Sequence, residues 1–120
     1  MTEHAEQCRL MLKARLWEGH YPELALLHAI PLGGLRHKAT ARRMKAEGAK
    51  AGVPDLCLPV PRGNYHGAYI EMKFGRNKPT ERQRWWLDRL AEQGYYIAVC
   101  WSCDEAWQEI IAYLGMEATP

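Results

Sequence analysis

Two short segments decide the fold: Asp55-Leu-Cys-Leu-Pro-Val60 and Gly67-Ala-Tyr-Ile-Glu-Met-Lys-Phe74. Both have the length and the apolar content of β-strands. The residues between them, Pro61-Arg-Gly-Asn64, are typical of a turn. The sequence therefore predicts that the two segments pair as a β-hairpin.

The second strand has two different faces, because successive side chains on a strand point in opposite directions. Tyr69, Glu71 and Lys73 share one face. The other face carries the apolar members Ala68, Ile70, Met72 and Phe74. A hairpin partner brings Asp55 within reach of the face that holds Glu71 and Lys73.

The rest of the chain alternates between helical and strand patterns. Helices are expected over residues 3–17, 39–48, 80–94 and 102–114, and further strands over 24–30 and 95–101. Thr80-Glu-Arg-Gln83 matches a capping box, which opens a helix. The order predicts an α/β fold in which helices flank a mixed central sheet, with one domain over residues 1–120.

Composition narrows the class of protein. A chain of 120 residues with 48% apolar and 25% charged residues fits one soluble globular core. No apolar stretch is long enough to span a bilayer, and the N-terminus lacks a signal-peptide layout. We expect a cytoplasmic protein whose four cysteines are reduced and mostly buried.

Positive charge gathers in one segment. Residues 36–50 carry six Lys or Arg and a single acid, Glu47, while the remainder carries ten basic and thirteen acidic residues. This segment is a candidate surface for phosphate groups. On charge alone, a solvated helix face is the favoured interpretation.

Asp55 and the tripeptide Glu71-Met72-Lys73 carry the most informative chemistry. Hydrolysis of a phosphodiester uses a divalent cation, and carboxylate oxygens hold Mg²⁺ well. A neighbouring lysine can position the attacking water. Alternating charge on an exposed hairpin face is the competing interpretation.

Further motifs occur in a fixed order around this constellation. They are His28-Ala-Ile-Pro-Leu-Gly-Gly-Leu-Arg36, Ala41-Arg-Arg-Met-Lys-Ala-Glu-Gly48, Ala51-Gly-Val-Pro-Asp-Leu56, Gly67-Ala-Tyr-Ile-Glu-Met-Lys73, Gln83-Arg-Trp-Trp-Leu87, Leu90, Gly94-Tyr95 and Asp104-Glu-Ala106. In order and spacing they resemble the virus-type replication-repair nuclease (VRR-NUC) family of the PD-(D/E)XK superfamily. The resemblance covers nearly the whole chain.

The resemblance implies a restriction-endonuclease-like fold and a metal-dependent endonuclease. It implies Asp55 and Glu71 as ligands of Mg²⁺ or Mn²⁺, the Met72 main-chain carbonyl as a third ligand, and Lys73 beside the water. It also implies a catalytic glutamine on the helix after this strand, which Gln83 matches. The capping box is the structural alternative for Gln83, and both roles are compatible.

The resemblance further implies a catalytic glutamate on the first helix, and two residues compete for it. Glu3 lies four residues before Gln7, which matches the family's E-x-x-x-Q pattern and places both on one helix face. Glu6 is the alternative, because Glu3 lies near the terminus, where helices fray.

In this setting the loop and helix of the basic segment are expected to contact DNA. Small residues let a phosphate approach the backbone, and cations neutralise it. The expected contacts are Gly33, Gly34, Arg36, Lys38, Arg42, Arg43 and Lys45. Stand-alone relatives resemble Holliday-junction resolvases, so the resemblance implies branched DNA as substrate and a homodimer.

Three rival functions remain at this point. The first is a monomeric nuclease that trims flaps or nicks duplexes. The second is a DNA-binding module with a degenerate nuclease site. The third is a thiol-redox or zinc function of Cys100 and Cys103, which have C-x-x-C spacing but no second such pair.

Overall fold

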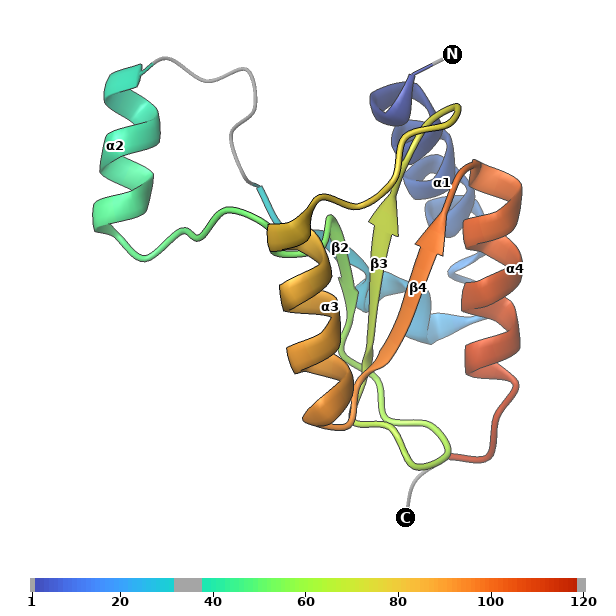
Figure 1. The fold of residues 1–120 in the computed structure, drawn as a ribbon. Helices are drawn as coiled ribbons and strands as arrows, with labels where there is room; N and C mark the ends of the chain where they lie inside the picture. The colour runs from blue at the N-terminus through green and yellow to red at the C-terminus, as the bar shows by residue number, and fades with distance from the viewer. Residues whose placement is uncertain (1, 32–37, 119–120) are drawn as a thin grey trace.

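A mixed four-stranded sheet forms the centre of the molecule, which the computed structural model describes for residues 2–31 and 38–118 (Figure 1). The strand order across the sheet is β1-β2-β3-β4. The strands are β1 (His28–Ala29), β2 (Leu56–Leu58), β3 (Ala68–Met72) and β4 (Tyr96–Cys100). The predicted α/β fold class with a mixed sheet is confirmed.

The predicted hairpin is present. β2 and β3 pair antiparallel, with Leu56 opposite Ile70 and Leu58 opposite Ala68. β4 pairs parallel to β3, and the helix α3 (Glu81–Glu92) connects these two strands. A parallel pair requires such a crossover connection, so the helical segment after the hairpin accounts for the mixed character of the sheet.

The remaining helices are α1 (Glu3–Trp17), α2 (Lys38–Ala46) and α4 (Cys103–Leu114). α1 and α4 pack together on one face of the sheet and α3 covers the other (Figure 1). The main core lies between the sheet and the α1–α4 layer, where Leu10, Ile70 and Ile110 are almost fully buried. The Tyr113 hydroxyl donates a hydrogen bond to the Val60 carbonyl at 2.6 Å, so it is satisfied within this core.

Helix caps match the sequence patterns. Thr80 and Gln83 form the predicted capping box at the start of α3. The hydroxyl of Ser102 accepts a hydrogen bond from the Glu105 N–H and caps α4. Both caps satisfy backbone donors that the first turn of a helix leaves free.

Two local predictions were wrong. Only two residues of the segment expected to be a strand (24–30) pair in the sheet, as β1, and its first three residues belong to a 3₁₀ helix, η1 (Pro22–Leu26). Pro22 at the first turn favours a helical start, because its fixed φ suits that position. The second wrong prediction concerns Phe74, which was expected on the apolar face of the second strand. β3 ends at Met72, two residues before Phe74, and Phe74 is 39% exposed.

α2 stands apart from the sheet and from the α1–α4 layer (Figure 1). Every described side chain from residue 39 to residue 47 is exposed or only half buried. None of the helices in residues 2–31 and 38–118 is long and apolar enough to cross a membrane. The four cysteines are free thiols, and all but Cys8 are buried, as expected.

Candidate active site

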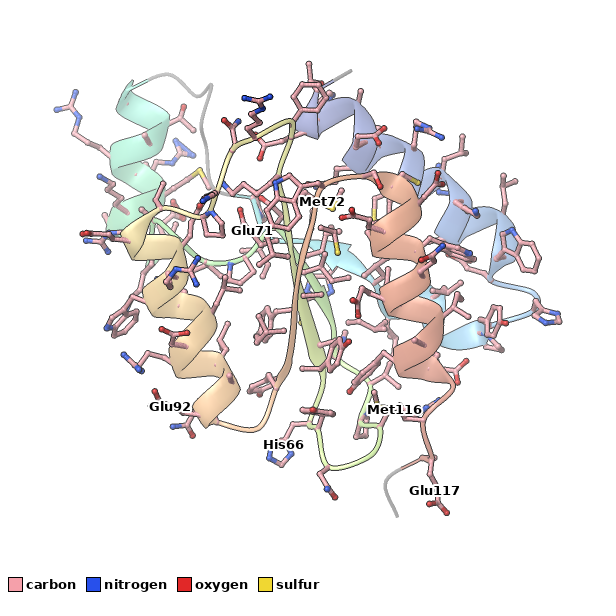
Figure 2. The ribbon with its side chains drawn as sticks, turned by 45° about the vertical axis from the view of Figure 1, so that its right-hand side comes forward. His66, Glu71, Met72, Glu92, Met116 and Glu117 are labelled. Carbon is pink, nitrogen blue, oxygen red and sulfur yellow. The ribbon has the colours of Figure 1, made fainter. Side chains whose placement is uncertain are left out.

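Asp55 and Glu71 lie side by side at one end of the hairpin. The register that pairs Leu56 with Ile70 sets Asp55 across from Glu71. The backbone around Asp55 is held in place because its carbonyl accepts from the Ile30 N–H at 2.8 Å. Its carboxylate Oδ2 accepts from the Met72 N–H at 2.7 Å. Figure 2 shows Glu71 and Met72 at this edge of the sheet.

Glu71 is buried with one carboxylate oxygen unsatisfied. Its side chain is 2% exposed, and its Oε1 atom has no hydrogen-bond partner among the described residues. The Lys73 ammonium lies 3.4 Å from the other oxygen, Oε2. Lys73 is itself 7% exposed, so the contact between these two side chains is largely shielded from water.

The environment disfavours two negative charges here. Burial raises the pKa of Asp55, although the Met72 N–H and the Lys73 ammonium oppose that rise. Burial, and then the charge of Asp55, raise the pKa of Glu71 to about 8. A carboxylate pair of this kind is stabilised by a proton or by a cation placed against its oxygens.

The two candidate acids of α1 occupy different environments. Glu3 lies at the site, with its Oε1 3.9 Å from the Lys73 ammonium, and it remains 43% exposed. Glu6 faces α4: its Oε1 accepts from the Cys103 N–H at 3.1 Å and its Oε2 accepts from Arg9 at 2.9 Å. The Cys103 N–H holds the pKa of Glu6 below its usual value. Glu6 therefore caps the start of α4, although it lies far from that helix in the sequence.

The structural role of Glu6 was not predicted from the sequence. Its contact with Cys103 joins residues 97 positions apart, and no local pattern signals such a pair. The available signal was indirect, because the first-turn donors of a helix always need acceptors.

Gln83 is engaged at the start of α3. Its side-chain oxygen accepts from the Thr80 N–H at 2.9 Å, as a capping box requires. In the part of the chain that the structure describes, no hydrogen bond joins Gln83 to Asp55, Glu71 or Lys73. The capping-box role of Gln83, which was the structural alternative to a catalytic role, is therefore present.

Only part of the predicted DNA surface can be described. Gly33, Gly34 and Arg36 lie outside the described residues, and Lys38 is the first residue of α2. Arg42, Arg43 and Lys45 are exposed on α2 and are called the α2 patch below. Arg43 forms a 3.8 Å ion pair with Glu47, in which both side chains are exposed.

The donor set at the site is small. Within residues 2–31 and 38–118, no group of three His, Cys, Asp or Glu side chains could hold a metal ion. Asp55 and Glu71 supply two carboxylates, so a metal here requires further oxygen ligands from the main chain, water or substrate. The unsatisfied oxygen of Glu71 fits such an ion.

The cysteine pair gains no support as a reactive site. Cys100 and Cys103 are 1% and 3% exposed. Burial raises the pKa of the Cys100 thiol to about 12 and also raises that of Cys103. Thiolates, which redox and zinc chemistry need, are disfavoured at both positions.

Comparison with known proteins identifies relatives. The family model of the VRR-NUC domain matches residues 5–104. A solved structure described as a VRR_NUC domain protein is similar to this chain with a TM-score of 0.80 and 29% sequence identity. That likeness covers 98% of this chain and 92% of the other. No curated protein matches.

Proposed function

Because this chain belongs to the VRR-NUC family, a family of nucleases, we propose that it is a metal-dependent endonuclease that hydrolyses phosphodiester bonds in DNA. One observation carries this proposal. Two adjacent carboxylates, Asp55 and the buried Glu71, share a site with the Lys73 ammonium. A buried arrangement of this kind costs stability without a cation, which is typical of functional sites.

Asp55 and Glu71 would hold Mg²⁺ or Mn²⁺, and the main-chain carbonyl of Met72 is the proposed third protein ligand. Glu71 suits this role because its Oε1 lacks any other partner among the described residues. When bound, the ion offsets negative charge on the phosphoryl oxygens and makes water a better nucleophile at neutral pH.

Lys73 acts on the attacking water in this proposal. Its ammonium lies against Glu71 and is shielded from solvent, so its charge acts at close range. It donates hydrogen bonds that orient the water and stabilise negative charge as the bond to phosphorus forms. Glu3, 3.9 Å from the same ammonium, helps to position Lys73. Gln83 is proposed to contact the site when substrate is bound.

The α2 patch is proposed to bind the phosphate backbone of DNA. Gly33, Gly34 and Arg36 are proposed to contribute to the same contact. Its three side chains are cationic and exposed, and phosphate contacts are made by such groups. These contacts carry no base information, so cleavage depends on the shape of the DNA more than on its sequence.

The proposed substrate is branched DNA of the four-way-junction type, and the proposed active form is a homodimer. Symmetric cleavage of two strands requires two active sites related by a two-fold axis. α2 projects from the body of the subunit, which leaves it free to reach a second subunit or a second DNA arm (Figure 1).

The test is a cleavage assay on labelled four-way junctions, flaps and plain duplexes with Mg²⁺, Mn²⁺ or EDTA. The expected result is metal-dependent cleavage that is fastest on the junction, with a particle mass of two chains by light scattering. Fastest cleavage of flaps by a monomer would replace the junction proposal. Binding without cleavage under any metal would contradict the nuclease proposal.

Two variants make the test specific. Glu71→Gln should abolish cleavage because it removes a carboxylate ligand. Glu92→Gln is the matched control, since Glu92 is exposed at the far end of α3 from Glu71 (Figure 2). Equal activity of the two variants would contradict the assignment of Glu71.

A further inference from the structure

A pocket lies between α3 and the segment that precedes Asp55. Its volume is about 610 Å³, within the range of small-ligand sites. Three cations and two indoles line it: Lys45, Lys50, Arg82, Trp85 and Trp86. Among the described residues, no acidic side chain lines it. Its surface therefore combines positive charge with aromatic rings.

The cations and one indole are available to a ligand. Among residues 2–31 and 38–118, no ion pair engages Lys45, Lys50 or Arg82. Trp85 is 52% exposed, which is unusual for the largest apolar side chain. Arg89 lies on its ring, 5.6 Å from the centroid, and helps to orient it.

The wall of the pocket is firmly attached to α3. The Trp86 indole N–H donates to the Ala51 carbonyl at 3.1 Å. Gly52 adopts a φ of +94°, and a Cβ atom there would lie 2.6 Å from Arg82 Cγ and 3.0 Å from Trp86 Cδ1. Only glycine allows the chain to approach α3 this closely. The pocket is therefore built by close packing of two segments.

The pocket also lies near the proposed site. Ala51 lines it, and Asp55 is only four residues further along the chain. Four residues span at most about 14 Å when fully extended. That upper limit equals roughly four nucleotides along one strand of a DNA duplex.

We propose that this pocket binds an unpaired nucleotide of a single-stranded DNA segment next to the cleavage site. The base stacks on Trp85, and Lys50 and Arg82 neutralise the adjoining phosphates, as in other single-strand sites. The inference rests on the proposed nuclease function: an unpaired nucleotide exposed at the branch point of a junction would enter the pocket.

The test measures binding in EDTA, so that no DNA is cut. The probes are a fluorescent oligothymidylate of about 12 nucleotides, within the usual range of single-strand sites, and a blunt duplex of equal length. Trp85→Ala should weaken binding of the single strand about 5- to 100-fold, while duplex binding changes less than about twofold. Trp85→Phe should retain most of the affinity, because an aromatic face remains.

A second pair of variants tests how much the positive charge of the pocket contributes to DNA binding. Arg82→Gln should weaken single-strand binding, whereas Arg84→Gln should not, since Arg84 is an exposed cation on the same helix outside the pocket. Because Trp85, Arg82 and Arg84 are all exposed, these variants are expected to fold, and circular dichroism checks this.

Three results would overturn the inference. In the first, Trp85→Ala binds the oligothymidylate as the wild type does. In the second, Trp85→Ala lowers the affinities for the single strand and for the duplex equally. In the third, DNA binding is unchanged but the variant is monomeric where the wild type is dimeric, which would assign the pocket to a second copy of the chain. Metal-dependent junction cleavage by the wild type separates failure of this inference from failure of the nuclease proposal.

Discussion

Replacing Glu71 by glutamine should stabilise the metal-free protein at neutral pH while removing the proposed cleavage activity. Glu71 is 2% exposed, lies against Asp55, and has one oxygen without a partner among the described residues. Its pKa is raised from 4.5 to about 8, by burial first and by the charge of Asp55 second. The same features that suit a cation ligand therefore oppose the ionised form when no cation is present.

The magnitude follows from the difference in proton binding. The unfolded chain loses the Glu71 proton near pH 4.5, whereas the folded protein keeps it until about pH 8. The folded state binds more protons in that window, so the free energy of unfolding falls as pH rises from 4.5 to 8. Each pH unit removes about 1.4 kcal/mol, and by pH 7 the loss is about 3 kcal/mol.

Glutamine has no proton to lose, so the variant should not show this fall. Its amide also keeps the shape of the protonated side chain and can donate towards Asp55. At pH 7 we expect Glu71→Gln to be more stable than the wild type by about 3 kcal/mol, or about 10 °C in Tm for a domain of this size.

The assay is thermal unfolding followed by circular dichroism between pH 4.5 and pH 8 in EDTA. Glu92→Gln is the control: Glu92 is exposed and bonded to Arg89, so that variant should follow the pH dependence of the wild type. Adding Mg²⁺ should raise the Tm of the wild type and leave that of Glu71→Gln nearly unchanged. A Glu71→Gln protein less stable than the wild type at pH 7 in EDTA would refute the reasoning.

Three further predictions follow from the site. Lys73→Ala should lower the rate of cleavage at saturating Mg²⁺ by roughly 100-fold or more, because it removes the ammonium beside Glu71; single-turnover kinetics measure this, and an unchanged rate would contradict the role of Lys73. Glu3→Ala should lower cleavage with little change in Tm, whereas Glu6→Ala should lower Tm because the Cys103 N–H loses its acceptor; the reverse pattern would assign the catalytic acid to Glu6. Replacing the three residues of the α2 patch by glutamine should weaken DNA binding for all sequences and reduce the salt dependence of log Kd by about 0.9 for each phosphate that is no longer neutralised, and an unaltered slope would place DNA elsewhere.

Local rules predicted the hairpin and the caps. The two-residue period of a strand put Glu71 and Lys73 on one face, and turn residues set the partner strand close to them. The capping box of Thr80 and Gln83 predicted the start of α3. These features depend on neighbours in sequence, so composition and spacing carry enough information to predict them.

Long-range features were beyond such rules. The contact of Glu6 with the start of α4 depends on how α1 and α4 pack, and a periodic pattern does not encode it. The pocket at Arg82 depends on the close approach of Gly52, which follows from a left-handed backbone at one residue. A signal did exist on α3, because Arg82 and Trp86 are four residues apart and share a helix face.

The two ends of the described chain lie at opposite edges of the sheet, and this matters for attaching the protein to anything else. Thr2 caps α1 one residue before Glu3, beside the edge that holds Lys73. Ala118 pairs with Arg62, and Met116 and Glu117 lie at the other edge from Glu71 and Met72 (Figure 2). A group attached near Ala118 therefore lies far from Glu71, whereas one attached near Thr2 lies beside Lys73.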